Sequence, residues 1–553
     1  MLFSRRRCAS LTIIRIWREM LYTFTGEVVE HSTSNPRREP RIFILIILMI
    51  ARLIPLWAAY RHHTFLSDDA YITLTYVKNL VKGHGFVFNY GPPILGTTTP
   101  LFTLIIAGLA KIIPWVDISI LAVFFTAFCW IGIVWIFYFF RESWEISSYQ
   151  VAIIGLVIIM TGWIGYLGME AYLFAFLFIL CLSLFHKRQY VFSGFTAGLL
   201  FLTRGEGVLV LFVILMFSLI TLYLKSKPLY YPAIRRSLYI VFGFLLPVLL
   251  WFIYAWFTFE NLFPNTLAAK MAQGQTALWK SFFEALTQEW IYLWGNEYFI
   301  GSLHLQNLWR ILVLLGLSVV IIEKRKFLPI LVWIGIYTSG YSILRVPAYG
   351  WYQLPVIFVL QILFAIGVIK CVDFLVGNFN LQKHRVFGIT ISICIVSFLF
   401  FILVKPVLSI LVHPNPDVKI SPYMAHKVRK YFLLSQLIRT NTKPDESIAY
   451  IEIGYLGYYT DNRIIDLAGL ILPDLVPHIA KGDFAWGFWH YKPDYYIHVL
   501  DFDWALASIR ENPAFHEQYK PVASLPGSPA FRGDLVVYKR VVEADIKRLG
   551  KGL

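Results

Sequence analysis

The sequence predicts a polytopic α-helical membrane protein that ends in a small α/β domain. Hydrophobic residues make up 58% of the 553-residue chain and charged residues only 15%, whereas soluble proteins are about a quarter charged. Apolar stretches of membrane-spanning length recur between residues 42 and 411. After about residue 412 this pattern gives way to short β-rich and helical runs.

The N-terminal segment 1–40 is basic and precedes the first apolar stretch. Its own apolar run is interrupted by Arg15 and Arg18, and no small-residue cleavage site follows, which argues against a secretory signal peptide. A basic amphipathic helix on the inner membrane surface is favoured over a disordered leader. We therefore expect a cytoplasmic leader here.

Eleven apolar stretches are predicted to cross the membrane, because a spanning helix needs about 20 mostly apolar residues. A twelfth run, 99–113, is shorter and carries Pro100, Lys111 and Pro114 at its ends, so we expect it to lie at the membrane interface. The predicted crossings centre on 42–60, 118–140, 150–168, 171–186, 189–203, 207–223, 238–258, 308–322, 328–344, 352–371 and 387–411.

Basic residues between the helices set the predicted orientation, since Lys and Arg concentrate in cytoplasmic loops. If the chain starts in the cytoplasm, eleven crossings place every such cluster inside, and a crossing at 99–113 would move them all outside. The net charge of +16 is therefore largely a topology signal of an inner or plasma membrane protein and implies no nucleic-acid partner. The clusters are Lys187–Arg188, Lys225, Lys227, Arg235–Arg236, Lys324–Lys326, and Lys383 with Arg385.

The Pro-rich stretch "HPNPDVKISPY" separates the apolar part from the C-terminal part. The runs "SIAYIEI", "RIIDLAGL", "DYYIHVL" and "DLVVYKR" are typical of strands, and 422–439 and 503–511 are typical of helices. They predict a small α/β domain, which by the same count of crossings lies outside the cell membrane. The predicted organisation is a leader 1–40, a transmembrane domain 41–411 with its first outer loop at 61–117, and the α/β domain 412–553.

Ionisable residues gather on the predicted outer face, and such residues near a membrane are costly and often functional. Each has a local explanation: Ser67, Asp68 and Asp69 open a predicted amphipathic helix, 69–82, where a capping hydroxyl and acids in the first turn are favoured. Similarly, Arg204 and Glu206 could be a local ion pair, and Arg345 a snorkelling anchor. Separate local explanations do not predict that acids and arginines share one face. The set comprises Asp68, Asp69, Glu170, Arg204, Glu206 and Arg345.

This set of side chains suits glycosyl transfer from a lipid-linked sugar. A carboxylate can take the proton of an acceptor hydroxyl while its oxygen attacks the anomeric carbon. Arginines can hold the departing phosphate bidentately. Aromatic residues, 17% of the chain, can stack on sugars or prenyl chains, although most serve lipid belts and helix packing.

The stretch "SDDAYITLTYVKNLVKGHGFVFNYG", followed by "GTTTPLFTLIIAGL", resembles the first outer loop of GT-C fold glycosyltransferases. The similarity is greatest to the bacterial group that includes the terminal arabinofuranosyltransferases of actinobacterial cell walls. It continues at "GMEAYLF", "TRGEGVL", "LFPNTLAAK", "YGWYQLP" and "IGYLGYYTDNRIIDLAGL" and so spans about 60 to 475. The resemblance implies an integral membrane enzyme that uses a polyprenyl-phosphate sugar, acts on the outer face and inverts the anomeric centre.

The resemblance also implies roles for individual residues. The acid pair is expected to hold the catalytic base; we expect Asp68 to be the base and Asp69 to orient it or bind acceptor, although the sequence does not separate the two. Donor-phosphate contacts are implied for Arg204 and Arg345. Supporting or substrate-binding roles are expected for Glu170, Glu206, Asn265, Lys270, Tyr349 and Trp351.

The chain departs from the resembled group at three positions. It has Thr75 where the relatives often carry Arg, Leu95 where they carry an acid, and Gly205 where they carry Pro. The transferred sugar, hexose or pentose, therefore stays open, and arabinose is not assumed. The acceptor is expected to be a glycan, a lipid or a protein of the cell envelope.

No metal ligand is assigned from the sequence. Some GT-C enzymes use a divalent cation, which stays open here, but the acid pair and His62, His63 and His84 match no specific ligand spacing. The five cysteines lie in or beside predicted helices or in the leader, so no disulfide framework or zinc site is expected.

Other functions compete with glycosyl transfer. A lipid or glycan transporter or flippase would place charges near mid-membrane and often shows paired repeats, and neither feature is apparent. A non-catalytic assembly protein would explain the outer domain but not the acid pair with its arginines. Among enzymes, an O-antigen ligase or a protein mannosyltransferase shares the lipid donor and is the nearest alternative.

Overall fold

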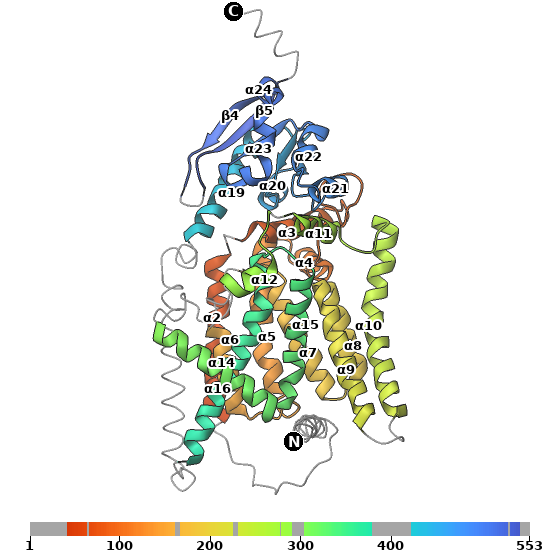
Figure 1. The fold of residues 1–553 in the computed structure, drawn as a ribbon, viewed down its shortest axis with the longest axis vertical. Coiled ribbons are helices and arrows are strands. Elements are labelled where there is room, and N and C mark those ends of the chain that lie inside the picture. The colour runs from red at the N-terminus through yellow and green to blue at the C-terminus, as the bar shows by residue number, and fades with distance from the viewer. Residues whose placement is uncertain are drawn as a thin grey trace, which may run out of the picture.

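A bundle of long helices carries a layer of short helices and a five-stranded sheet at one end (Figure 1). The structure is a computed structural model and describes residues 41–63, 66–160, 166–224, 230–276, 278–289, 303–378, 422–528 and 531–541.

The bundle helices occupy ten of the eleven predicted crossings, and the eleventh, 387–411, lies outside the described residues. By length and composition, three helices in the described part are able to cross a membrane: Ile118–Phe139, Pro232–Phe259 and Gly350–Phe374. Other apolar helices there are shorter, and the number of crossings stays a prediction. The bundle comprises α2 (Arg41–His62), α5 (Ile118–Phe139), α6 (Ser148–Met160), α7 (Ala171–His186), α8 (Tyr190–Thr203), α9 (Val208–Leu224), α10 (Tyr230–Phe259), α14 (Leu303–Ile322), α15 (Leu328–Ile343) and α16 (Leu354–Asn378).

Glycines allow two pairs of bundle helices to approach closely. A Cβ atom on Gly194 of α8 would lie 2.0 Å from the carbonyl oxygen of Ile240 in α10. One on Gly316 of α14 would lie 1.8 Å from the carbonyl oxygen of Leu363 in α16. Small residues at such contacts let helix backbones pack within a membrane.

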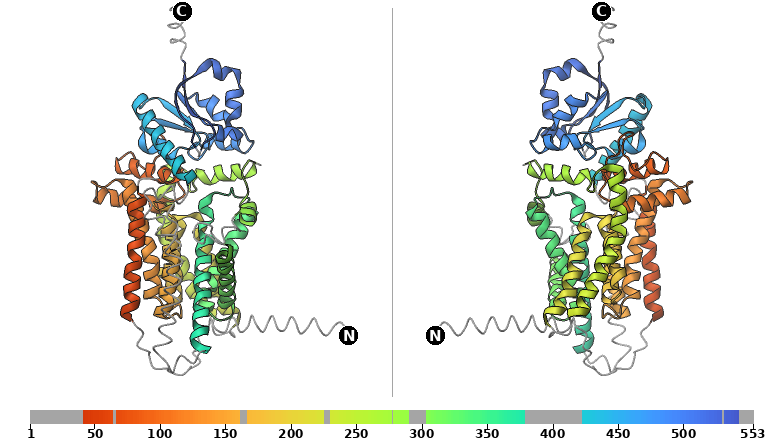
Figure 2. Two further views of the ribbon diagram at one scale, coloured as in Figure 1. Left: turned by 90° about the vertical axis from the view of Figure 1, so that its left-hand side faces the viewer. Right: turned by 90° about the vertical axis from the view of Figure 1, so that its right-hand side faces the viewer.

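Three short helices lie across one end of the bundle (Figure 2): α3 (Asp68–Val81), α4 (Pro100–Ile112) and α11 (Asn265–Gln275). The predicted helix after Ser67 is confirmed as α3, and the Ser67 hydroxyl caps it by accepting the Ala70 amide at 3.3 Å. Helix α4 begins with Pro100, a residue favoured at the first helical position. It coincides with the predicted interfacial run.

The C-terminal sheet is mixed, with strand order β2-β1-β3-β5-β4. Strand β1 pairs parallel with β2 and β3, while β5 pairs antiparallel with β3 and β4. The four predicted strand runs contain β1 (Ser447–Tyr450), β2 (Arg463–Asp466), β3 (Tyr495–His498) and β5 (Leu535–Arg540). The helices beside the sheet are α19 (Pro422–Asn441), α20 (Gly454–Tyr459), α21 (Val476–Ile479), α22 (Ala485–Tyr491), α23 (Asp503–Glu511) and α24 (Pro513–Gln518).

The sequence prediction missed strand β4 (Tyr519–Leu525). It contains Pro521, which has no amide hydrogen to donate and is confined to sheet edges. Its side chains are mostly exposed, so the alternation of apolar and polar residues is weak. By contrast, β3 lies inside the sheet and all four of its residues are buried.

Candidate active site

Asp68 joins the first loop to the C-terminal part of the chain. Its Oδ2 accepts the Gly454 amide at 2.9 Å and its Oδ1 accepts the Tyr455 amide at 3.0 Å. These amides open α20, and the free N–H groups at a helix start favour a carboxylate. Burial, followed by the charge of Glu452, raises the pKa of Asp68 well above its usual range, although both amides lower it. Asp68 therefore acts as the N-terminal cap of α20.

The other end of α20 is also held by α3. The Lys78 ammonium donates to the carbonyl oxygens of Gly457 at 2.9 Å and Tyr458 at 2.8 Å, where a cation suits the helix dipole. The Tyr71 ring packs on the Tyr455 ring, with centroids 4.4 Å apart. The first-loop helix thus carries the cap for each end of α20.

Asp69 has a different environment from its neighbour. Its side chain is half-buried, and no hydrogen bond to its carboxylate is formed within the described part of the chain. Burial raises the pKa of Asp69 to about 6; Lys270 and Lys427 lower it, while Glu452 and Glu170 raise it. These four charges come from α11, α19, the segment after β1 and the residue before α7. Asp69 therefore lies where the first loop, the bundle and the C-terminal part meet.

Arg204 forms a buried ion-pair network with two glutamates. Its Nη1 lies 3.0 Å from Glu170 Oε1 and its Nε lies 2.5 Å from Glu206 Oε1. All three side chains are exposed by 10% or less. The local pair of Arg204 with Glu206 is therefore present. Glu170, which directly precedes α7, completes the network. Because two carboxylates balance one guanidinium, Arg204 has little charge left to offer an anion.

Lys270 of α11 lies in an aromatic box. Its ammonium is 5.2, 5.1 and 5.3 Å from the ring centroids of Tyr349, Trp351 and Tyr352, in cation–π range. It also donates to the Tyr352 hydroxyl at 3.2 Å. Among the described residues, no carboxylate lies within ion-pair distance of this ammonium. Lys270 is thus a half-buried cation whose charge remains open to an anionic ligand.

Arg345 does not share this environment. It follows α15 in a left-handed conformation with φ of 49°, and its side chain is exposed. The pKa of the exposed Glu284 is lowered first by hydrogen bonds from Ser281 and also by the charge of Arg345. No described contact joins its guanidinium to Asp69, Arg204 or Lys270.

Helix α11 positions the "DLAGL" segment that follows β2. Asn265 Nδ2 donates to the carbonyl oxygens of Gly469 at 2.8 Å and Leu470 at 3.0 Å. Gln273 Nε2 donates to the carbonyl oxygen of Ala468 at 3.1 Å and its Oε1 accepts the Tyr349 hydroxyl at 2.7 Å. Asn265 therefore supports the backbone of the site rather than an open ligand position.

Sequence reasoning missed three side chains of the site. Tyr352 lies within "YGWYQLP", where the sequence analysis assigns roles to Tyr349 and Trp351 only. Glu452, which pairs with Lys427 at 2.8 Å, is a charged residue two positions after the buried strand β1, and that position is a usable signal. Nothing in the sequence around Lys427 distinguishes it from other lysines on a helix.

Within the described residues, no group of three or more His, Cys, Asp or Glu side chains is arranged to hold a metal ion. The ring of His84, near the acid pair in sequence, packs instead against the Tyr90 ring at 4.6 Å between centroids. The side chain of His62 lies outside the described part.

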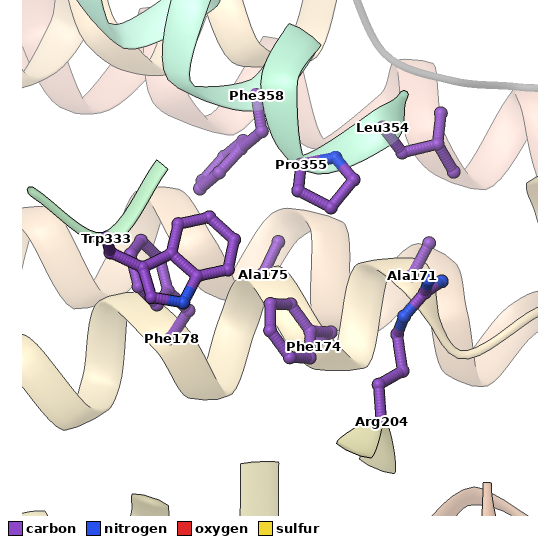
Figure 3. A pocket seen from close by; sticks show the side chains of 9 residues that line it. All are labelled: Ala171, Phe174, Ala175, Phe178, Arg204, Trp333, Leu354, Pro355 and Phe358. Atoms are coloured by element: carbon purple, nitrogen blue, oxygen red, sulfur yellow. The ribbon is translucent and has the colours of Figure 1, made fainter. Parts of the chain in front are cut away.

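An apolar cavity lies beside Arg204, between α7, α15 and α16 (Figure 3). Arg204 is the one charged residue among those lining it. Figure 3 shows the Arg204 side chain extending toward Ala171 at one end of the cavity. The lining residues are Ala171, Phe174, Ala175, Phe178, Arg204, Trp333, Leu354, Pro355 and Phe358.

The solved structures that share the fold of this chain include two GT-C glycosyltransferases. The archaeal oligosaccharyltransferase AglB from Archaeoglobus fulgidus, in complex with an inhibitory peptide and a dolichol-phosphate, matches 91% of this chain and 74% of its own, with 11% identity and a TM-score of 0.51. ArnT from Cupriavidus metallidurans in the apo state matches 90% of this chain and 98% of its own, with 13% identity and a TM-score of 0.53. The expected GT-C fold is thereby confirmed.

The C-terminal part matches a family model over residues 423–540, described as a domain of unknown function (DUF8728). No curated protein matches the chain.

Proposed function

We propose that the chain is a membrane glycosyltransferase that moves a sugar from a polyprenyl-phosphate donor to a cell-envelope acceptor on the extracytoplasmic face, with Asp69 as the general base. The observation that carries this proposal is the environment of Asp69: a half-buried carboxylate has a raised pKa and lies near enough to Lys270 for that charge to lower the pKa, on a GT-C fold. The dolichol-phosphate in AglB supports a lipid phosphate as the donor group.

Asp69 suits the role of base better than Asp68, which the sequence favoured. A general base must reach the acceptor proton, and its pKa works best near the operating pH. Both carboxylate oxygens of Asp68 already accept backbone amides. Asp69 makes no such bonds in the described part, and its pKa of about 6 keeps it ionised near neutral pH.

The proposed reaction is a single displacement. The acceptor hydroxyl oxygen attacks the anomeric carbon and its proton passes to Asp69. The bond between the anomeric carbon and the phosphate oxygen breaks, and its electrons leave with the polyprenyl phosphate. Attack opposite the leaving group inverts the anomeric centre.

Lys270 is the proposed phosphate ligand. A cation placed where negative charge develops stabilises the transition state, and the aromatic box fixes this ammonium without neutralising it. Arg204, held by Glu170 and Glu206, is assigned a positioning role, since its guanidinium lies over the Tyr352 ring at 5.5 Å from the centroid. Arg345 is assigned no direct contact with the donor.

The apolar cavity beside Arg204 has an internal volume of about 10 Å³, roughly that of one water molecule. It is too small to hold a prenyl chain, so no lipid site is assigned to it. The organisation 1–40, 41–411 and 412–553 is retained in this proposal, with the catalytic site between the second and third of these parts.

The proposal is tested by transfer assays on purified full-length protein in nanodiscs. The donors are polyprenyl-phosphate pentoses and hexoses, the acceptor is cell-wall polysaccharide, and the readouts are sugar incorporation and release of polyprenyl phosphate. Asp69→Asn is expected to abolish transfer, whereas Asp117→Asn, which alters another first-loop capping carboxylate, is expected to keep it. Equal transfer by wild type and Asp69→Asn would refute the base assignment. Movement of the lipid-linked sugar across the membrane without transfer would favour a flippase.

A further inference from the structure

A polar cavity of about 190 Å³ lies at the opposite end of α3 from Asp69. It is enclosed by the last turn of α3, the loop that follows it and the C-terminal segments before β2. Asn79, which lines it, is ten residues after Asp69, so the two are about 15 Å apart along the helix axis. The cavity is therefore separate from the site proposed for the chemistry.

Asn79, which lines this cavity, has a buried hydrogen-bond acceptor without a partner among the described residues. The residue is 2% exposed, and its Nδ2 donates to the carbonyl oxygens of Val87 at 2.9 Å and Phe88 at 2.8 Å. Its Oδ1 is buried and has no hydrogen-bond partner among the described residues. A buried acceptor without a partner costs free energy.

The walls of the cavity are fixed before any ligand arrives. Asn89 Nδ2 donates to the Ile464 carbonyl oxygen at 2.8 Å, and its Oδ1 accepts the Ile464 amide at 2.9 Å. This pair of bonds ties the loop after α3 to strand β2. A ligand that binds here does not have to order the loop, and preorganised sites bind more tightly for that reason.

The mouth of the cavity combines an aromatic ring with charged groups. The Tyr90 ring is 49% exposed and lines the opening together with Asp445, Asp461 and Arg463. An aromatic face packs on the C–H face of a sugar, carboxylates accept its hydroxyls, and a guanidinium donates to them. The two carboxylates are matched by two cations of the same lining, Lys78 and Arg463, and the Asp461 carboxylate lies 3.8 Å from the Lys78 ammonium and 3.7 Å from that of Lys82, so the lining has no net charge. The lining is therefore suited to a neutral sugar.

We propose that this cavity is a remote subsite that binds a neutral sugar unit of the glycan acceptor. The identification of that glycan as an acceptor rests on the proposed function. The subsite would hold the acceptor chain several units away from the hydroxyl that reacts at Asp69, so that α3 spans both positions. It would select glycans over single sugars and lipids.

The test measures glycan binding to the full-length protein in nanodiscs, without a lipid donor. Neutral arabinan, galactan, mannan and dextran fragments are titrated by calorimetry, with polygalacturonate fragments as the acidic comparison. At least one neutral fragment is expected to bind, and Tyr90→Ala and Asp461→Asn are expected to weaken it about tenfold. Trp115→Ala is the matched control, because that ring is 80% exposed and does not line the cavity.

The outcomes separate this subsite from the proposed reaction. Asp69→Asn is expected to bind the fragment as tightly as wild type. The subsite is refuted if no neutral fragment binds, if acidic fragments bind equally well, or if Tyr90→Ala and Asp461→Asn bind like Trp115→Ala. Retained binding with no transfer from any donor would refute the reaction alone. Unchanged acceptor KM in an active Tyr90→Ala enzyme would refute the subsite alone.

Discussion

The carboxylate of Asp68 and the backbone of Gly454 are in direct contact, although they are 386 residues apart in sequence. The Gly454 amide donates to Asp68 Oδ2 at 2.9 Å, and a Cβ on Gly454 would lie 1.8 Å from the Asp68 carbonyl oxygen. No side chain fits at that distance. The start of α20 therefore reaches the first loop only because residue 454 is glycine.

Gly454→Ala is expected to separate α20 from α3. Overpacking of a fixed backbone contact costs about 1–3 kcal/mol, and the loss falls on the contact between the first loop and the C-terminal part. Thermal unfolding of the full-length protein measures this loss. Gly108→Ala is the control, since nothing lies within 4 Å of a Cβ there; equal stability of the two variants would contradict the contact.

The rate of transfer is expected to depend on the ionisation of Asp69. Burial raises the pKa of this carboxyl to about 6, and a general base works only when it is deprotonated. The value of kcat/KM should therefore fall about tenfold per pH unit below pH 6 and level off above it. A pH profile of transfer measures this, and a profile that stays flat down to pH 4.5 would contradict it.

Lys270→Met is expected to lower kcat/KM about 10²-fold, because one cation is lost from the developing phosphate charge. The inhibition constant of free polyprenyl phosphate should rise in the same variant. Arg345→Met serves as the matched control, because its exposed side chain makes no described contact with the site. A larger loss of kcat/KM in Arg345→Met than in Lys270→Met would contradict the assignment of Lys270, and not Arg345, as the phosphate ligand.

Arg204→Met is expected to destabilise the protein by about 3–5 kcal/mol, because it leaves two buried carboxylates without their cation. The melting temperature in nanodiscs measures the effect. The control is Arg532→Met, which removes an ion pair with Asp501 from a side chain that is 81% exposed and is expected to change stability by less than about 1 kcal/mol. Equal melting temperatures for the two variants would show that the Arg204 network does not stabilise the fold.

The sequence predicted the helices and most strands because their signals are local. Ser67 marks the start of α3, and apolar runs mark the bundle. The different environments of Asp68 and Asp69 were not predictable from the sequence. Consecutive helix residues point about 100° apart, and the neighbours of each side chain depend on the tertiary structure. Asp68 accepts hydrogen bonds from the amides of α20, whereas Asp69 makes no such bond among the described residues and is influenced by the charge of Lys270.

The two arginines illustrate the same limit. In the sequence Arg204 and Arg345 are equivalent cations at outer turns. Folding brings Glu170 to Arg204 from a neighbouring helix and leaves Arg345 exposed. Lys270 looked like a supporting residue because the aromatic box around it comes from a segment about 80 residues later.

The double capping of α20 by α3 also bears on how chains of this fold can be recombined. A chimera that exchanges only 412–553 between two GT-C proteins would pair α20 with a foreign first loop, and the Asp68 and Lys78 partners would be lost. The exchangeable module is therefore discontinuous: residues 66–90 have to travel with the C-terminal part. Because Asp69 and the polar cavity lie on the same segment, such a transplant would carry the proposed base and the proposed glycan subsite together and leave the lipid-facing helices behind.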